Sequence, residues 1–217
     1  MYLPYKFKKL SINFDADGLM EDLSRVQEDW WIRYEFDGTA HDVVPLMTSG
    51  GSIWDSDGSA NHRFEEPFLS TEYLGLLPYL KKVLNSFTSP PTRCRLMRIG
   101  AGETVLPHQD RNPHWNDKVR LHVPIVTDPR VLFHMWSERP ERRAADRETV
   151  HMKSGEAWVF NSWYFHAVSN ESTGIRVHLV GDFRCFGGLD ELLFEGVPPE
   201  DVDEAKGFRY TPANASY

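Results

Sequence analysis

The pattern of hydrophobic and polar positions changes at about residue 93. From there on, short runs rich in β-branched and aromatic residues alternate with turns marked by Gly, Pro, Asn and Asp. Such runs are typical of short strands separated by tight turns. The expected strands are 95–99, 103–106, 119–125, 131–134, 149–152, 157–160 and 175–180. Many short strands at this spacing predict a mainly β fold, a barrel or a double-sheet jelly roll of the cupin type.

The first 92 residues follow a different pattern. Residues 17–30 place apolar side chains on one face of a helix, and a second helix is expected from about 71 to 87. Pro78 either kinks this second helix or moves its start later. Residues 37–62 are rich in Gly, Ser and Asp, and are expected to form a long loop or lid. We expect the two helices to pack on the outside of the jelly roll.

Length and composition limit the alternatives. A chain of 217 residues suits one core, so we expect one domain with an N-terminal elaboration (1–92), a jelly-roll core (93–186) and a C-terminal tail (187–217). A net charge of -8 argues against nucleic-acid binding, which needs clustered basic residues. The sequence shows neither a signal peptide nor an apolar run of about 20 residues. A cytoplasmic protein without a membrane partner, a monomer or homodimer, is the expectation.

The residues with the most specific chemistry are His108, Asp110 and His166. Residues i and i+2 of a strand point to the same face, so His108 and Asp110 project together if the segment after Leu106 is extended. His166 follows another apolar strand, and is expected at a similar strand end. Two histidines and one carboxylate form a facial triad that holds Fe(II) and leaves other coordination positions open. These three residues are therefore the predicted metal ligands and catalytic centre.

Two strands carry the same Arg-x-His pattern. Arg176 and His178 share one face of the last strand, and Arg120 and His122 share one face of an earlier strand. A buried arginine without a partner is costly, so a buried anionic ligand would explain both. Arginine binds carboxylates through two parallel hydrogen bonds, as a keto-acid cosubstrate requires. Ion pairs with inward Asp or Glu remain the alternative explanation, particularly for Arg120.

The stretch from about Met97 to Asp182 resembles the aspartyl/asparaginyl β-hydroxylase family of 2-oxoglutarate dioxygenases. It is similar, within that group, to the bacterial proline cis-4-hydroxylases. The motifs occur in the family's order. They are Met97-Arg98-Ile99, Pro107-His108-Gln109-Asp110, Arg120-Leu121-His122, Gly155-Glu156-Ala157-Trp158-Val159-Phe160, His166 and Ile175-Arg176 through Asp182. The resemblance covers about 85 residues, and the first 90 give no comparable match.

This resemblance implies roles for the motif residues. His108, Asp110 and His166 would bind Fe(II), and Arg176 would pair with the distal carboxylate of 2-oxoglutarate. Arg120 and His122 would lie near the keto-acid end of this cosubstrate, and O₂ would be the oxidant. Animal members of the family lack the carboxylate ligand that Asp110 provides here. Its presence favours a free amino acid, a small metabolite or a carrier-bound residue as substrate, and it argues against halogenation.

The substrate contacts are less clear from the sequence. Trp115 follows the triad loop, His134 ends a strand expected at the mouth of the jelly roll, and Trp163 neighbours the distal histidine. Arg130 could hold a substrate carboxylate. For the aromatic residues, packing in the core or at the rim is the alternative, and for Arg130 it is a solvated surface position.

The predicted activity is hydroxylation of an unactivated C–H bond of an amino acid or amino-acid-derived substrate, with release of succinate and CO₂. The substrate could be free, peptidyl or carrier-bound. Desaturation or epoxidation in natural-product biosynthesis would use the same cofactors. A different cupin-like metalloenzyme would not need Arg176, and a non-catalytic cupin-like binding module would not need the three metal-competent residues.

Overall fold

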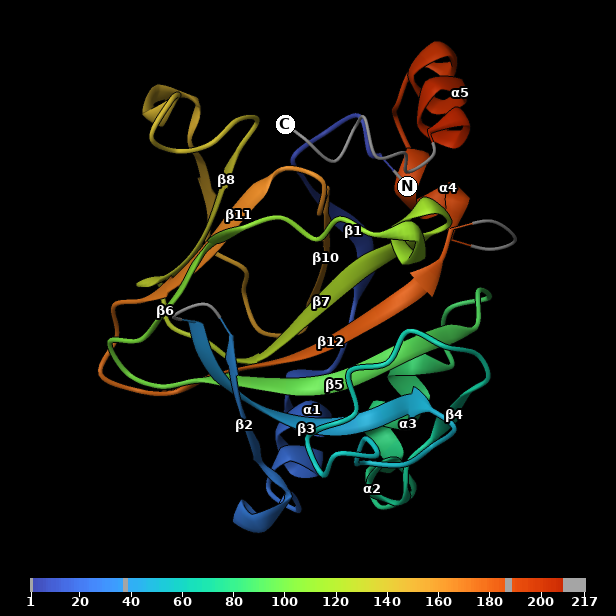
Figure 1. Cartoon of the computed structure of the whole chain (residues 1–217), viewed down its shortest axis with the longest axis vertical. Coiled ribbons are helices and arrows are strands. Elements are labelled where there is room, and N and C mark those ends of the chain that lie inside the picture. The colour runs from blue at the N-terminus through green and yellow to red at the C-terminus, as the bar shows by residue number, and fades with distance from the viewer. Residues whose placement is uncertain (1, 37–38, 186–188, 209–217) are drawn as a thin grey trace.

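Two antiparallel sheets form the framework of the protein (Figure 1). The computed structural model describes residues 2–36, 39–185 and 189–208. In this part of the chain, the larger sheet has eight strands and the smaller sheet has four. The predicted mainly β jelly roll with helices packed outside is confirmed.

The larger sheet has the order β1-β10-β7-β12-β5-β3-β2, and β4 pairs with β3. Its strands are β1 (Phe7–Asn13), β2 (Ile32–Phe36), β3 (Thr39–Ser49), β4 (Phe68–Ser70), β5 (Pro91–Ile99), β7 (Lys118–Val126), β10 (Glu156–Phe160) and β12 (Arg176–Arg184). Half of these strands come from the first 92 residues. The N-terminal part therefore completes the sheet, in addition to supplying helices.

The smaller sheet has the order β6-β11-β8-β9. Its strands are β6 (Thr104–His108), β8 (Val131–Trp136), β9 (Glu148–Val150) and β11 (Phe165–Asn170). β11 lies at the centre of this sheet between β6 and β8, and its first residues are in register with the end of β6. The sequence analysis did not predict β11, although it placed His166 beside a strand.

The helices lie mainly on one face of the larger sheet (Figure 1). They are α1 (Ala16–Leu23), α2 (Glu72–Gly75), α3 (Pro78–Leu84), α4 (Asp190–Phe194) and α5 (Pro199–Gly207), with short 3₁₀ turns at Glu28–Trp30, Pro113–Asn116 and Ala144–Asp146. Within the described residues, no helix is long and apolar enough to cross a membrane.

Alternation along the central strands separates two environments. On β7 and β12, residues such as Leu121, Val123, Val177 and Leu179 point outward and form the main core together with the helices. The alternating residues point to the interior between the two sheets, where they are polar. A smaller apolar cluster fills the rest of the interior. Its residues come from both sheets and include Phe133. Period-2 alternation thus places apolar side chains under the helices and polar ones in the interior.

Three expectations for the N-terminal half need correction. The long loop expected over 37–62 is wrong for Thr39–Ser49, which form β3 between β2 and β5. Residues 37 and 38 lie outside the described residues. The helix expected over 17–30 ends at Leu23. The helix expected from 71 to 87 is divided in two, and Pro78 is the first residue of α3, as the alternative of a later start predicted.

Asp22 joins α1 to the beginning of α3. Its side chain is completely buried, and its Oδ2 accepts a hydrogen bond from the Leu80 backbone N–H at 2.8 Å. Leu77, the residue before α3, makes no capping hydrogen bond through its own side chain. The Asp22 carboxylate therefore satisfies one of the free N–H groups at the start of this helix, and Arg25 pairs with its other oxygen.

We predict that Asp22→Ala lowers the free energy of unfolding by about 1–3 kcal/mol, because the buried Leu80 N–H loses its acceptor. Urea unfolding followed by circular dichroism measures this change. Glu21→Ala is the matched control, since the exposed Glu21 side chain forms an ion pair with Arg25, and should change stability by less than about 0.5 kcal/mol. Equal effects of the two variants would contradict the role given to Asp22.

Candidate metal centre and active site

His108, Asp110 and His166 lie together where β6 and β11 meet. His108 is the last residue of β6 and is paired in register with His166, the second residue of β11. Asp110 follows two residues later, where its backbone N–H bonds the Ser162 carbonyl at 3.0 Å. One potential ligand atom from each residue lies within 4.8 Å of the others. The structure therefore brings together the three residues that the sequence singled out.

Backbone carbonyls fix the orientation of both imidazole rings. His108 Nδ1 lies 2.9 Å from the Leu106 oxygen, and His166 Nδ1 lies 3.1 Å from the Tyr164 oxygen. A carbonyl can only accept, so each Nδ1 carries the proton and each Nε2 keeps a free lone pair. His166 Nε2 lies 4.0 Å from Asp110 Oδ2. Burial, and then the neighbouring His108, lower the pKa of His166 to about 3, which keeps its ring neutral.

Arg120 holds the carboxylate of Asp110 in place. Its Nη1 donates to Asp110 Oδ2 at 2.7 Å, while its Nε donates to Asp182 Oδ1 at 2.9 Å. The Trp115 ring lies against the same guanidinium at 4.6 Å. Burial favours the neutral acid, but Arg120 together with His166 and His108 outweighs it, and the pKa of Asp110 is lowered. Asp110 is thus an ionised, oriented carboxylate.

Arg176 is a buried cation. Its side chain is 1% exposed, and its Nη2 lies 2.7 Å from His178 Nδ1 and 3.4 Å from His122 Nδ1. No carboxylate pairs with it among the described residues. Because a guanidinium only donates, His178 Nδ1 must accept, and its proton lies on Nε2. Burial lowers the pKa of Arg176 to about 9, so it remains charged at neutral pH.

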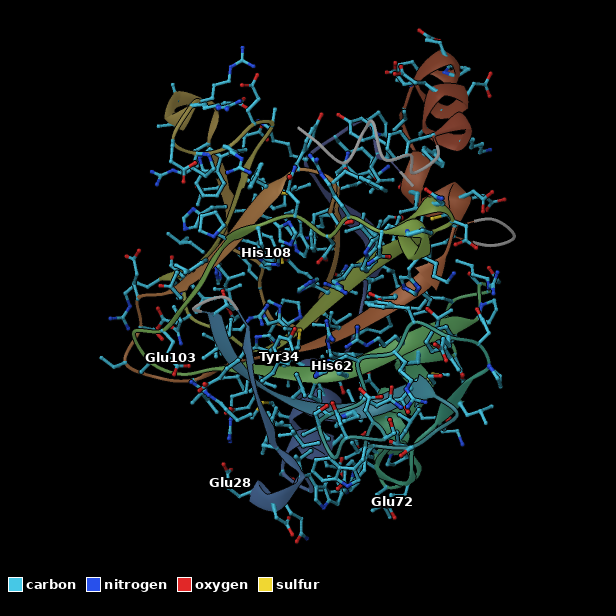
Figure 2. All side chains as sticks on the ribbon, in the orientation of Figure 1. Glu28, Tyr34, His62, Glu72, Glu103 and His108 are labelled. Carbon is cyan, nitrogen blue, oxygen red and sulfur yellow. The ribbon has the colours of Figure 1, made fainter. Side chains whose placement is uncertain are left out.

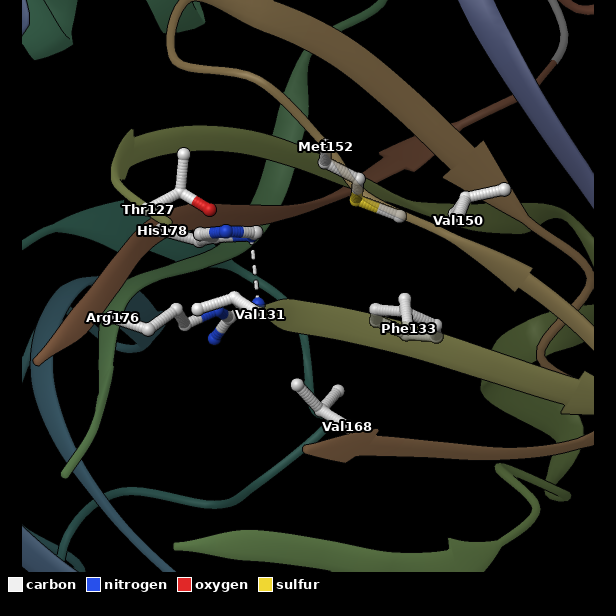
Figure 3. A pocket seen from close by; sticks show the side chains of 8 residues that line it. All are labelled: Thr127, Val131, Phe133, Val150, Met152, Val168, Arg176 and His178. Carbon is white, nitrogen blue, oxygen red and sulfur yellow. Dashed lines mark hydrogen bonds between the residues drawn. The ribbon is translucent and has the colours of Figure 1, made fainter. Parts of the chain in front are cut away.

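A small cavity lies beside Arg176 (Figure 3). Thr127 and His178 line it on the polar side, and Phe133 and Val168 are among its apolar neighbours. Within the described part of the chain, Arg176 Nε, His178 Nε2 and Thr127 Oγ1 are buried without a hydrogen-bond partner. Buried polar groups are normally satisfied, so three such donors around one cavity indicate a site for a ligand with acceptor atoms.

Two explanations were open for the burial of Arg120: a bound anionic ligand, or ion pairs with inward Asp or Glu. Its guanidinium is paired with Asp182 and Asp110, so ion pairs with inward carboxylates account for its burial. His122 is buried beside Arg176 and packs against Phe133. Contact of Arg120 or His122 with a cosubstrate stays a prediction.

Two of the predicted substrate contacts are packing residues. Trp115 is 1% exposed and lies under Arg120, with His114 against its ring. Trp163 is also buried, its backbone oxygen accepts from Gln109, and its ring packs against Phe208. Arg120 and His114 contact the Trp115 ring, and direct contact of Trp115 or Trp163 with a substrate stays a prediction.

His134 and Arg130 lie away from the three predicted metal ligands, and their contact with a substrate stays a prediction. His134 pairs in register with Ala167, one residue after His166, and therefore points to the opposite face of the smaller sheet. There its ring nitrogens contact the hydroxyls of Thr149 and Ser169. Arg130 is in the turn before β8, where it forms an ion pair with Asp128 on the surface.

Four residues facing the interior were not identified from the sequence. Arg93 and Arg95 on β5 share a face with each other, and Tyr34 and His41 come from β2 and β3. The Arg93-x-Arg95 alternation was a usable signal, since it repeats the Arg-x-His pattern of β7 and β12. Tyr34 and His41 gave no such signal because their strands were not expected.

A jelly roll with a His–Asp–His group where two strands meet matches the class of non-haem Fe(II) oxygenases. The chain belongs to the aspartyl/asparaginyl beta-hydroxylase family, whose model matches residues 21–185. It is accordingly a non-haem Fe(II)- and 2-oxoglutarate-dependent dioxygenase. The match extends well before Met97, so the N-terminal half shares the family pattern that the sequence analysis found only later in the chain.

Solved structures of the same fold agree in topology at low sequence identity. A 2OG-Fe(II) oxygenase family oxidoreductase from Burkholderia pseudomallei has a TM-score of 0.55 at 14% identity, over 84% of this chain and 87% of that one. A prolyl hydroxylase from Trichoplax adhaerens, in complex with a hypoxia inducible factor peptide, has a TM-score of 0.53 at 12% identity, with 83% and 84% covered. The epimerase SnoN, in complex with Fe3+ and alpha ketoglutarate, has a TM-score of 0.53 at 14% identity, over 82% of this chain and 78% of that one. No curated protein matches the chain.

We predict that Asp182→Asn weakens metal binding by about 10–100-fold, because Arg120 loses the charge that orients it toward Asp110. Anaerobic titration with Co(II) or Fe(II) measures the affinity. Asp128→Asn removes an acid that pairs with Arg130 on the surface, and should bind metal like the wild type. If both variants keep the wild-type affinity, the support of Asp110 through Arg120 is not important for metal binding.

Proposed function

We propose that the protein hydroxylates an unactivated C–H bond of an amino acid or an amino-acid-derived substrate, with release of succinate and CO₂. In this proposal His108, Asp110 and His166 bind Fe(II), and Arg176 binds the distal carboxylate of 2-oxoglutarate. The family to which the chain belongs, named for hydroxylation of aspartyl and asparaginyl residues, supports an amino-acid-type substrate.

One observation carries the proposal: among the described residues, Arg176 has no carboxylate partner and the buried donors beside it have no acceptors. A buried cation without a counter-charge is strongly unfavourable, and so are buried donors without acceptors. A carboxylate in the cavity would accept from Arg176 Nε, and Thr127 Oγ1 and His178 Nε2 also line that cavity. The site therefore suits an anion, and 2-oxoglutarate is the anion that this class of enzyme uses.

The donor set suits Fe(II). Two neutral imidazoles and one carboxylate match the facial triad of non-haem iron oxygenases. When bound, iron with 2-oxoglutarate supplies the oxidising chemistry for the C–H bond. The residues of the chain hold the ligands: the Leu106 and Tyr164 carbonyls fix the two imidazole tautomers, and Arg120 keeps Asp110 ionised and oriented.

The interior environment supports this chemistry. Phe133 stacks on His166 at 6.2 Å between ring centroids, and Phe160 packs against the same imidazole at 4.8 Å. These rings shield the buried ligand from water and fix its orientation. Exclusion of water strengthens the interactions of charged groups and limits side reactions of an oxidising centre.

We predict that Arg176→Met raises the apparent KM for 2-oxoglutarate by about 100-fold or more, because two charge-assisted hydrogen bonds are lost. Affinity for Fe(II) alone should change little. Anaerobic titration followed by the visible band of the Fe(II)–2-oxoglutarate chelate, together with succinate release, measures both. The apparent KM of Arg176→Lys should lie between those of the wild type and Arg176→Met, since lysine keeps the charge but not the planar guanidinium group.

The control for Arg176 is Arg130→Met. Arg130 lies on the surface with Asp128, so this variant should behave like the wild type. Unchanged turnover of 2-oxoglutarate in Arg176→Met would show that another residue binds the cosubstrate, and would refute this part of the proposal.

A substrate screen tests the reaction itself. Succinate release should be stimulated by a free amino acid, an N-substituted form or a short peptide, and the product should gain one oxygen atom by mass spectrometry. Loss of two hydrogens without a gain of oxygen would instead indicate desaturation. Absence of both the chelate band and succinate release would favour a non-catalytic binding module.

A further inference from the structure

Arg93 and Arg95 on β5 form a second group of cations, here called the β5 arginine pair. Arg93 is 7% exposed, its Nη2 lies 3.0 Å from His62 Nδ1, and its guanidinium lies 4.8 Å from the centre of the Phe64 ring. Arg95 is partly buried and makes no hydrogen bond or ion pair with any described residue. Neither arginine has a carboxylate partner in this part of the chain.

The β5 arginine pair lies on the interior face that also carries the candidate active site. Arg95 pairs in register with Val180 of β12, and Ile99 further along β5 pairs with Arg176. The charges of both arginines act on Asp110 and Asp182. His41 interacts electrostatically with both Arg95 and His108. The pair and the predicted metal ligands therefore face the same interior space between the two sheets, here called the basin.

The segment after β3 encloses this part of the basin. The Tyr34 ring contacts the rings of His41 and His62, with centroids 4.9 and 4.4 Å away. Figure 2 shows Tyr34 and His62 side by side, with His108 on the other side of the interior. A small cavity between β3 and this segment is lined by both arginines, His62 and Pro45. Both arginines of the pair therefore line an interior cavity beside this segment.

The basin has an excess of positive charge. Four arginines face it: Arg93, Arg95, Arg120 and Arg176. Among the described residues, the carboxylates of Asp110 and Asp182 act on the first three, and no carboxylate pairs with Arg176. His41 and His62 add no charge at neutral pH, because burial lowers the pKa of His41 to about 3 and that of His62 to about 4.

Bound Fe(II) and 2-oxoglutarate do not remove this excess. Their charges of about +2 and -2 cancel, so the two positive charges of the β5 arginine pair remain without counter-charge. The whole chain has a net charge of -8, so the excess is a local feature of the basin. A third component with negative charge would compensate it, and the substrate is the component that must still enter.

We propose that the β5 arginine pair binds the free carboxylate of the substrate. The inference rests on the proposed function and narrows it: the enzyme oxidises a free organic acid of the amino-acid type. It does not take a residue whose carboxylate is masked as an amide, an ester or a carrier thioester. Arg95 is the primary contact because it makes no hydrogen bond or ion pair with the residues that the structure describes. Arg93, which is held by His62 and Phe64, binds the same carboxylate from the neighbouring position on β5. Planar guanidinium groups match a carboxylate through paired hydrogen bonds.

The test measures thermal stability of the protein loaded with Co(II) and 2-oxoglutarate, which does not turn over. One sample receives the twenty common amino acids as free acids, and a second receives the same amino acids as carboxamides. The free acids should raise the Tm of the wild type by about 5 °C or more at 100-fold excess over Kd, and the carboxamides should not. Arg95→Met should abolish the rise, Arg95→Lys should reduce it, and Arg130→Met should leave it unchanged.

Arg95→Met also has an effect without any ligand. Removing a charge that has no hydrogen-bond or ion-pair partner among the described residues should raise the Tm of the ligand-free protein by about 2–4 °C, and this rise would show that the variant folds. Three results would overturn the inference: carboxamides that stabilise as well as the acids, a rise that persists in Arg95→Met, or no rise with either set. Stabilisation by inorganic phosphate in place of the acids would overturn it too.

The same samples separate this inference from the proposed function. If the Fe(II)–2-oxoglutarate chelate band forms and depends on Arg176, but the acids have no effect that depends on Arg95, only the carboxylate site fails. If no chelate band forms in the wild type, the proposed function itself fails.

Discussion

The Arg120 guanidinium joins Asp110 to Asp182, and the arrangement of the candidate metal centre depends on this link. Asp110 follows the end of β6 in the smaller sheet, whereas Arg120 and Asp182 lie on neighbouring central strands of the larger sheet. One side chain therefore ties the two sheets together at the point where the metal ligands meet. Removal of any member leaves a buried charge without its partner, which is more costly than loss of a surface ion pair.

The two faces of the larger sheet differ in chemical character. Its outer face packs against the helices and supplies most of the apolar core, which stabilises the fold. Its inner face carries arginines and histidines, and several of their buried nitrogens have no hydrogen-bond partner among the described residues. We interpret these unpaired groups as a cost in stability that cosubstrate and substrate offset when they bind. An interior organised in this way is poised for anionic ligands before they arrive.

The sequence was sufficient for features that depend on spacing and period. His108 and Asp110 could be placed together because i and i+2 share a face, and Arg176 stood out as a charged residue in an apolar strand. Features that depend on register could not be predicted. His134 is one residue out of phase with His166, which only the pairing of β8 with β11 reveals. β3 was missed because its residues were grouped with the Gly-, Ser- and Asp-rich segment that follows, and because Pro45 interrupts the strand pattern.

The most direct measurement is the iron anomalous signal from crystals grown without oxygen in the presence of Fe(II) and 2-oxoglutarate. The account predicts one iron position bound by His108 Nε2, Asp110 and His166 Nε2, with the distal carboxylate of 2-oxoglutarate on Arg176 and the β5 arginine pair left free for substrate. Iron at any other position, or the distal carboxylate of 2-oxoglutarate on Arg93 and Arg95, would contradict it.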